Sequence, residues 1–518
     1  MSEQTIFRNA KLADGSLADF FVTGGRFSAI VPAGTAPPAD FAAVAPAIGT
    51  PGIVDPAIID LDGQLVVPAF VEGHIHLDTS FYGDAWRPHI PCTNGFDVRE
   101  RVAFQARNLA AAAPMAERAK NQLELCVGNG SLAMRSHVMV DASVGLSHVE
   151  TILAVREEYR DLIDIQLVAF PQSGILSSPG TAEMLDEALR LGCDLVGGLD
   201  PASFDRDVKG HLDVVFALAR KHGAGVDIHL HDGGALGLFQ VEEIAARTKT
   251  LGMAGHVAVS HAYGLGDIPP DALARAGAML AAAGVAIMTN APGNHAFPPV
   301  AALRQAGVTV FSGSDNIRDS WWPYGDGDML NRANMIGYRS GFYEDRELAA
   351  AFDVVTHAGA RALGLADYGI AVGAKADFVA IRRSTCPKRW WRCRRTARSI
   401  GGARPSPEMA RCWRADTRCR QRAASRIAHT SIDRLGRSGW HGGQRALIRR
   451  LLAEIEQAAQ DKENDPNRHK SDHQHGDRRA RAVACSGDDG PMVHGSSSEI
   501  PSGQQILRQT TAEAGCSR

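Results

Sequence analysis

Long hydrophobic runs are absent from this chain of 518 residues, and this and other shortages exclude several classes of protein. No stretch of 18 apolar residues occurs, so we expect no transmembrane helix. The first residues, MSEQTIFRNAKL, lack a basic stretch followed by an apolar core and do not predict a secretory signal. Nine cysteines are too few for a disulfide scaffold. We therefore expect a cytoplasmic protein without a membrane partner.

Charge is divided unevenly along the chain. Residues 1–381 hold 27 basic and 44 acidic side chains, whereas residues 382–518 hold 28 basic, 25 of them arginine, and 14 acidic. One globular design rarely changes composition so abruptly. Residues 382–518 have three interpretations: a nucleic-acid-binding tail, a segment translated in a shifted reading frame, or a zinc site formed by Cys386, Cys393, Cys412 and Cys419. The enrichment in Arg, Cys and Trp favours the shifted frame, so we expect an aberrant or disordered tail without strands, and nucleic-acid binding is not favoured.

Short apolar runs alternate with Ala-, Leu-, Arg- and Glu-rich helical stretches between residues 66 and 361. Eight such runs occur, at 66–74, 132–140, 163–170, 193–199, 225–231, 256–262, 284–289 and 308–314. Buried parallel strands alternating with helices predict an α/β fold, a (β/α)8 TIM-like barrel, with a doubly wound sheet as the alternative. Residues 1–65 are typical of a small antiparallel β unit. A strand within 362–381 is expected to return to it and complete a flanking β-sandwich.

Histidine and aspartate stand where several of these strands end, which favours the barrel because active sites lie at the carboxyl ends of its strands. His74 and His76 are one residue apart on a strand, so both side chains point to the same side. His229 ends the fifth strand and Asp315 follows the eighth. Three imidazoles and one carboxylate suit Zn²⁺ or Fe²⁺, and we predict one divalent metal per chain. Such a metal generates hydroxide from bound water near neutral pH, Asp315 is placed to shuttle a proton, and His261 to polarise the attacked carbon or orient the hydroxide.

Several motifs together resemble the cytosine deaminase-like branch of the amidohydrolase superfamily. They are GHIHLD (73–78), VAFPQSGIL (168–176), DIHLHD (227–232), SHAY (260–263) and SGSDNIRDSWWPYGDGDML (312–330). CDLVGGLDPA (193–202) and SDNIRD (314–319) are closer still to members that remove an alkylamine from a hydroxylated triazine ring. The resemblance spans roughly residues 5–381. It implies a metal-dependent hydrolase that attacks a ring C–N bond of a cyclic amidine and releases ammonia or an amine, on a TIM-like barrel with a flanking β-sandwich.

The resemblance also implies roles for individual residues. His261 matches the catalytic histidine of the family, Gln172 the glutamine that hydrogen-bonds the amide edge of the substrate ring, and Trp321 an aromatic wall. The residues that match the metal ligands are His74, His76, His229 and Asp315.

Two departures from the cytosine deaminase pattern concern the substrate. Those enzymes carry H-C-D-E after the fifth strand, where the glutamate moves protons, whereas this chain has Asp232 at that place with His231 beside it. We predict catalytic roles for both. Asn316, predicted to contact the substrate, replaces a second aspartate after the eighth strand. These changes argue against cytosine itself. A cytosine deaminase proper remains an alternative, as does a catalytically impaired barrel with a nucleic-acid-binding basic tail.

Other parts of the predicted barrel mouth leave alternatives open. No lysine ends the fourth strand, which argues against a carbamylated bridge between two metals. His137 and Asp141, at the end of the second strand, either orient ligands or have a structural role. The segment 82–98 suits a substrate-covering loop or simple packing. A homo-oligomer is possible.

Overall fold

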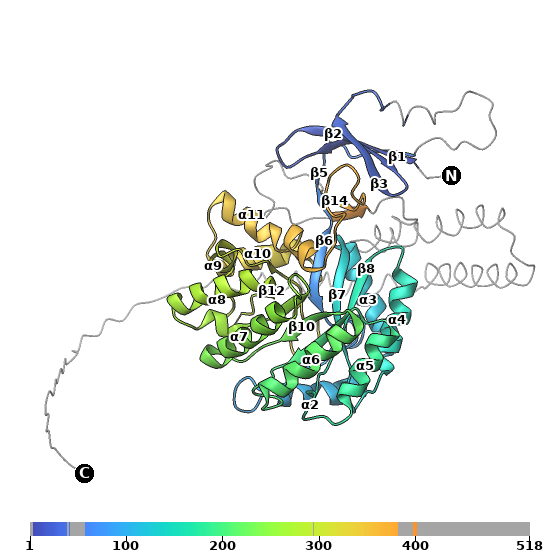
Figure 1. Ribbon diagram of the computed structural model, residues 1–518. Helices are drawn as coiled ribbons and strands as arrows, with labels where there is room; N and C mark the ends of the chain where they lie inside the picture. The colour runs from blue at the N-terminus through green and yellow to red at the C-terminus, as the bar shows by residue number, and fades with distance from the viewer. Residues whose placement is uncertain (1–3, 39–40, 42–56, 294, 382–396, 401–518) are drawn as a thin grey trace, which may run out of the picture. The chain divides into compact units, whose positions relative to one another are not determined.

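Eight parallel strands form a barrel in the computed structural model, which describes residues 4–38, 41, 57–293, 295–381 and 397–400 (Figure 1). Each strand pairs with the next in chain order, so the predicted barrel of eight strands is confirmed. The alternative of a doubly wound sheet is excluded, since that fold has a crossover in strand order. The strands are β6 (Phe70–Ile75), β7 (Ser131–Met139), β8 (Asp164–Phe170), β9 (Leu195–Leu199), β10 (Gly225–His229), β11 (Val257–Ser260), β12 (Val285–Met288) and β13 (Val310–Phe311).

The barrel closes where the backbone after β13 meets β6. The N–H of Gly73 donates to the carbonyl of Ser312 at 3.1 Å, and the N–H of Asp315 donates to the carbonyl of His74 at 2.8 Å. A parallel bridge joins Ile75 to Asp315. These bonds lie beyond the short β13, so the closing seam continues to the level of the predicted metal ligands.

Helices lie along the outside of the barrel and bury one face each. In α6 (Val208–His222), Asp207 caps the first turn by accepting a hydrogen bond from the N–H of Gly210, and Gly223 ends the helix in a left-handed conformation. Its buried residues recur at the spacing of three to four that places them on one face toward the strands. The other helices are α2 (Val98–Leu109), α3 (Met115–Gly128), α4 (Ser147–Tyr159), α5 (Thr181–Leu191), α7 (Gly234–Thr250), η1 (Tyr263–Gly266), α8 (Pro270–Ala283), α9 (Val300–Gln305), α10 (Met329–Ser340), α11 (Asp345–Asp353) and α12 (His357–Ala362).

A second sheet has the strand order β15-β14-β5-β1-β2-β3, with β4 also paired to β1. Its core is built on edge-to-face contacts among Phe7, Phe20, Phe27 and Phe378, with ring centroids 5.0–5.6 Å apart for the edge-to-face pairs. Its strands are β1 (Gln4–Lys11), β2 (Leu17–Thr23), β3 (Arg26–Pro32), β4 (Ala57–Asp60), β5 (Leu65–Pro68), β14 (Phe378–Ile381) and β15 (Ala397–Ile400). The return of the strand within 362–381 is confirmed, because β14 pairs with β5.

Three expectations about this sheet need correction. It is mixed rather than antiparallel, since β1 runs parallel to β4 and to β5. The apolar run at 66–74 is two strands, because the chain leaves this sheet at Pro68 and enters the barrel at Phe70. The strand β15 lies within 382–518, where we expected none. It pairs antiparallel with β14, whose backbone offers unpaired groups on that side whatever the composition of its partner.

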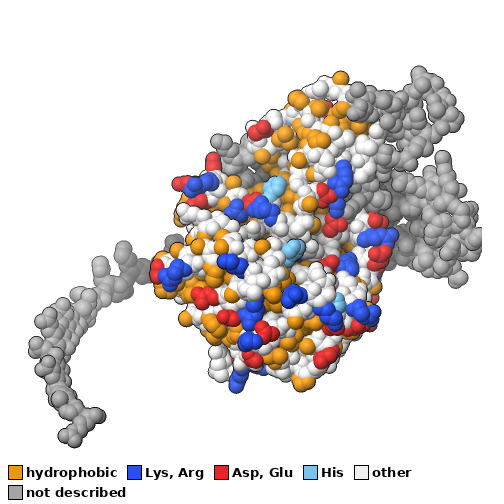
Figure 2. All heavy atoms as spheres, in the orientation of Figure 1, with side chains coloured by type: hydrophobic (Ala, Val, Ile, Leu, Met, Phe, Trp, Pro, Cys, Tyr) orange, Lys and Arg blue, Asp and Glu red, His pale blue; other side chains and the backbone are white. Residues whose placement is uncertain are grey.

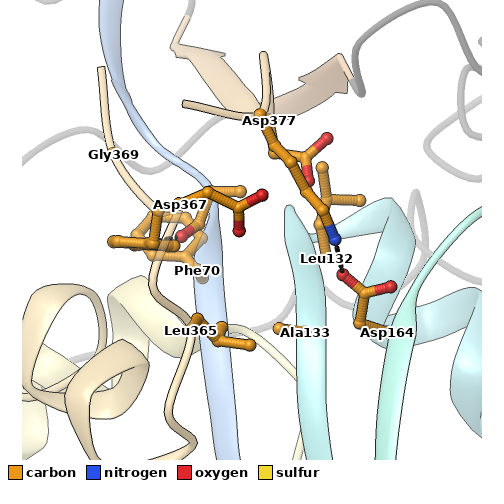
Figure 3. A pocket seen from close by; sticks show the side chains of 11 residues that line it. Phe70, Leu132, Ala133, Asp164, Leu365, Asp367, Gly369 and Asp377 are labelled. Carbon is orange, nitrogen blue, oxygen red and sulfur yellow. Dashed lines mark hydrogen bonds and ion pairs between the residues drawn. The ribbon is translucent and has the colours of Figure 1, made fainter. Parts of the chain in front are cut away.

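The two sheets are joined near the amino ends of the first barrel strands (Figure 3). Lys375, just before β14, forms an ion pair with Asp164 at the start of β8, at 2.8 Å. The hydroxyl of Tyr368 donates to the carbonyl of Ala69, in the short link between β5 and β6. These contacts lie at the amino ends of the strands. The histidines lie at the carboxyl ends, where the active sites of such barrels are found.

The surface of the described residues carries charges of both signs. Figure 2 shows acidic and basic side chains interspersed over the barrel helices on that face, and apolar side chains gathered over the second sheet. In the described part of the chain, no helix combines the length and apolarity needed to span a bilayer. The described residues all fall in the first of the two units into which the chain divides, Met1–Ile427. The four cysteines of the zinc hypothesis lie outside the described residues.

The closing seam generates a stability prediction. A Cβ on Gly313 would lie 2.3 Å from the backbone nitrogen and 2.4 Å from the carbonyl oxygen of His74, and backbone atoms cannot move aside cheaply. We expect Gly313→Ala to lower the free energy of unfolding by about 1–3 kcal/mol or more, measured by denaturant titration. Gly128→Ala is the matched control, since a Cβ there meets no atom within 4 Å and the position ends a helix. Equal stability of the two variants would contradict the role given to the seam.

Candidate active site

Four histidines and one aspartate meet at the carboxyl end of the barrel. The Nε2 atoms of His74 and His76 lie 3.5 and 3.4 Å from Asp315 Oδ1. The Nε2 atom of His229 faces that of His76 at 3.4 Å. All these side chains are buried. The structure therefore brings together every residue predicted to bind the metal.

His261, which was predicted to be catalytic and not to bind the metal, lies within the cluster of possible metal donors. One ligand atom each from His74, His229, His261 and Asp315 fall within 4.8 Å of one another. Sequence spacing gave no sign of this, because His261 lies alone at the end of its strand. The cluster thus offers one more possible donor than the four-ligand set.

Backbone strain marks the same end of the barrel. Among non-glycine residues, His261 has φ of 72°, Ala262 of 44° and Asp315 of 60°. Asp200 after β9 and Ala291 after β12 are also left-handed, with φ of 37° and 48°. Such conformations cost free energy and persist only where the surrounding structure enforces them. The strand ends are therefore held in the geometry that turns these side chains inward.

The pKa shifts of the clustered histidines and of Asp315 favour binding of a cation. Burial holds the pKa of His74 below its usual value and those of His229 and His261 well below it. Burial also acts to lower the pKa of His76, but the adjacent Asp315 carboxylate raises that pKa above its usual value. Burial alone would raise the pKa of Asp315, but the neighbouring imidazoles of His261, His74 and His76 hold it well below its usual range. Neutral imidazoles beside an ionised carboxylate are the forms that bind a divalent metal.

A buried chain of hydrogen bonds fixes which nitrogen of His74 is available. The Ser260 hydroxyl donates to Asp227 Oδ1 at 2.6 Å, so its oxygen accepts from His74 Nδ1–H at 2.9 Å. Asp227 in turn accepts from Arg135 at 2.9 Å. The His74 Nε2 lone pair then faces the cluster, and Nε2 has no hydrogen-bond partner among the described residues. This orphaned nitrogen and the mixed nitrogen and oxygen donors fit a divalent metal.

His137 and Asp141 have different surroundings. The ring of His137 lies against that of His74 with centroids 4.0 Å apart and a tilt of 32°, and neither of its nitrogens has a hydrogen-bond partner among the described residues. His137 thus packs against a predicted ligand without a hydrogen bond to it. Asp141 accepts a hydrogen bond from Ser173 Oγ at 2.6 Å, so it holds the loop that carries Gln172.

Two cavities open beside the donor cluster. The inner cavity, of about 30 Å³, is lined by His76, Thr79, Gln105, Phe170, Gln172, Leu199, His229, His231, His261, Asp315, Asn316 and Trp321. The outer cavity, of about 640 Å³, is walled mainly by the segments that follow β12 and β13, together with Phe96, Tyr263 and His231. Both are lined by His231, Asp315, Asn316 and Trp321. The three predicted substrate-binding residues, Gln172, Asn316 and Trp321, therefore all reach the inner cavity.

His231 and Asp232 are separated by the structure. His231 lines both cavities, and its Nδ1 is hydrogen-bonded to Asp200 Oδ2 at 2.8 Å. Asp232 lines neither cavity, because its carboxylate accepts a hydrogen bond from Gln240 Nε2 on α7 at 2.8 Å. Asp232, predicted to be catalytic, therefore lies outside both cavities, and its catalytic role stays a prediction. β10 ends at His229, so the different directions of His231 and Asp232 are set by their hydrogen bonds to Asp200 and Gln240.

Gln105 is the site residue that sequence reasoning missed. It is buried on α2, lines the inner cavity, and accepts a hydrogen bond from Trp321 Nε1 at 2.6 Å. The segment 82–98, expected to cover the substrate or to pack, leads into this helix and contributes Phe96 to the outer cavity. The sequence gives no local signal for Gln105, because its partners Gln172 and Trp321 lie 67 and 216 positions away along the chain.

Comparisons with known proteins agree with this geometry. The model of the Amidohydrolase family matches residues 57–388. The chain is 36% identical over 328 residues to the N-isopropylammelide isopropyl amidohydrolase of Pseudomonas sp. (strain ADP), covering 62% of this chain and 81% of that one. The chain belongs to the amidohydrolase family. The resemblance found in the sequence is confirmed, as is the expectation that the chain is an enzyme acting on carbon–nitrogen bonds outside peptides.

Two solved structures resemble this amidohydrolase. N-isopropylammelide isopropylaminohydrolase from Burkholderia multivorans is 34% identical with a TM-score of 0.70, covering 77% of this chain and 97% of that one. The 5-methylcytosine deaminase from Klebsiella pneumoniae is 26% identical with a TM-score of 0.64, covering 77% and 97%. Both support the fold, a barrel with a flanking sheet.

The hydrogen bond to His74 Nδ1 generates a prediction about metal binding. We expect Ser260→Ala to weaken the affinity of this amidohydrolase for Zn²⁺ by about 10–100-fold, since His74 loses the partner that fixes its tautomer and orientation. Competition with a chromogenic chelator measures this. The control is Thr248→Val, which removes a buried hydroxyl that donates to the carbonyl of Ile244 within α7. An unchanged dissociation constant in Ser260→Ala would contradict the assigned role of Ser260.

Proposed function

We propose that this amidohydrolase hydrolyses the bond between a ring carbon and an amino or alkylamino nitrogen of a hydroxylated triazine or a similar heterocycle. The observation that carries the proposal is the position of His231, which lines both cavities beside the donor cluster, whereas Asp232, at the place of the glutamate in the cytosine deaminase-like pattern, lines neither. The names of two similar proteins, both acting on N-isopropylammelide, support the same substrate class.

One divalent ion, zinc or iron, is the proposed cofactor. His74, His76, His229 and Asp315 would hold it, with His261 beside them. When bound, such an ion supplies Lewis-acid activation of water for attack on a ring carbon. The orphaned His74 Nε2 and the ionised Asp315 support this assignment.

The side chains around the cavities have separate proposed roles. Gln172 and Asn316 hydrogen-bond the ring edge, and Trp321 forms an aromatic wall beside it. Asp315 accepts a proton from the attacking water at Oδ1, while Asn290 holds its Oδ2 by a hydrogen bond of 2.8 Å. With Nδ1 bonded to Asp200, His231 has Nε2 left to deliver a proton to the departing nitrogen. The amine then leaves, and a ring carbonyl replaces it.

The outer cavity supports an alkylated leaving group. The cavity has a volume of about 640 Å³ and is lined by His231 and Asp315 where it meets the inner cavity. A substituent on the departing nitrogen therefore has room to extend outward. Aromatic side chains in its wall, Tyr263, Trp321 and Trp322 among them, suit apolar substituents. A homo-oligomer and a cytoplasmic setting remain predictions.

Deamination of 5-methylcytosine is the second candidate, favoured by the likeness to the Klebsiella enzyme. The experiment that separates the two is a panel assay of the zinc- and iron-loaded protein. Ammonia or alkylamine release is measured from N-isopropylammelide, unsubstituted aminotriazines, cytosine and 5-methylcytosine. We expect turnover of N-isopropylammelide, negligible turnover of cytosine, and loss of activity after removal of the metal by a chelator. Efficient turnover of the pyrimidines alone would support the second candidate instead.

The separation of His231 from Asp232 generates a matched pair of variants. We expect His231→Asn to lower kcat by about 10²–10⁴-fold, the usual effect of removing a positioned acid or base. Asp232→Asn keeps an oxygen for Gln240 and should change kcat by less than about tenfold, since it touches neither cavity. Steady-state kinetics and metal content are measured for both. The reverse ranking would return the proton-transfer role to Asp232.

A further inference from the structure

One face of α2 holds the loop that follows β13. Arg101 Nη1 donates to the carbonyl of Ser320 at 3.1 Å, and Asn108 Nδ2 donates to its hydroxyl oxygen at 2.9 Å. Between them, Gln105 accepts the indole hydrogen of Trp321 at 2.6 Å. Spacings of four and three residues place these side chains on one side of the helix. The helix thus contacts the loop at two consecutive residues, of which only Trp321 reaches the inner cavity.

The indole of Trp321 also sets the direction of the hydrogen bonds beyond it. An indole N–H only donates, so the atom of Gln105 that faces it is the carbonyl oxygen, Oε1. The amide nitrogen of Gln105 must then point the other way, where it lies 3.0 Å from Met139 Sδ and 3.5 Å from Gln172 Oε1. A donor facing Gln172 leaves the carbonyl end of that amide turned toward Gln105. The –NH₂ group of Gln172, at the other end of its amide, then points away from Gln105.

We infer that Gln105 is a positioning residue that fixes the direction of the Gln172 amide and thereby the hydrogen-bond pattern that the site accepts. With its carbonyl turned toward Gln105, Gln172 offers an N–H donor to the inner cavity. The ring edge that it recognises must then present an acceptor, a ring carbonyl or an unprotonated ring nitrogen. This inference rests on the proposed function for the identity of the ring, but the order of the hydrogen bonds does not depend on it.

The kinetic test is a double-mutant cycle with Gln105→Met and Gln172→Met, which keep similar side-chain volumes. Each single variant should raise KM for N-isopropylammelide by about tenfold with a smaller change in kcat. The double variant should be no worse than Gln172→Met, because Gln105 acts through Gln172. Additive effects would overturn the inference.

Asn108→Leu is the matched control. It removes a hydrogen bond from the same helix face to the same loop, but Asn108 contacts Ser320 and not Gln172. If α2 only holds the loop in place, Asn108→Leu should raise KM as much as Gln105→Met does, and that result would overturn the inference. We expect its KM to stay within about twofold of wild type.

A second measurement needs no turnover. In protein labelled with ¹⁵N-glutamine, the side-chain amide signals of Gln172, assigned by their loss in Gln172→Met, should shift in Gln105→Met and in Trp321→Phe but not in Asn108→Leu. Unshifted signals in Gln105→Met would overturn the inference. If no ring in the panel is turned over, the proposed function fails, and these signals still decide whether Gln105 sets the direction of the Gln172 amide.

Discussion

The closure of the barrel between β6 and the chain after β13 is the constraint on which the site depends. The hydrogen bond from Asp315 N–H to the His74 carbonyl fixes the last of the proposed ligands directly beside the first. The close approach of Gly313 to the backbone of His74 allows no side chain between them. The same backbone contacts therefore complete the fold and bring the carboxylate to the two histidines, so a change that opens the seam would separate the proposed ligands.

Beneath the donors, a buried polar layer gives the site its orientation. Asp227, Ser260 and Arg135 lie inside the barrel, where unpaired polar groups are costly, and each is hydrogen-bonded to another of the three or to a ligand. The left-handed backbone at His261 and Asp315 adds strain that the surrounding strands must offset. The strands and the segments directly after them thus hold the groups proposed to bind a metal, whereas those proposed to select the substrate lie on loops and on α2.

The parts of this amidohydrolase proposed to select the substrate come from segments far apart in the chain. Gln105 lies on a helix that follows the long loop after β6, Gln172 follows β8, and Trp321 follows β13. Asp141 and Asp205 hold the loop of Gln172, the latter by accepting backbone hydrogen bonds from residues 175–177. This arrangement allows substrate preference to change through loops and α2 without disturbing the donor cluster.

The sequence by itself determined the barrel, its eight strands, and the meeting of His74, His76, His229 and Asp315. These follow from local periodicity and from the rule that parallel strands present their carboxyl ends at one edge. His231 and Asp232 were predicted to be catalytic together, and their separation was not foreseen. Only the tertiary structure decided the division of 66–74 between two sheets, the approach of His261 to the donors, and the contact of Gln105 with Gln172 and Trp321. The last contact joins residues 67 and 216 positions apart, and no local pattern encodes a hydrogen bond between side chains so distant along the chain.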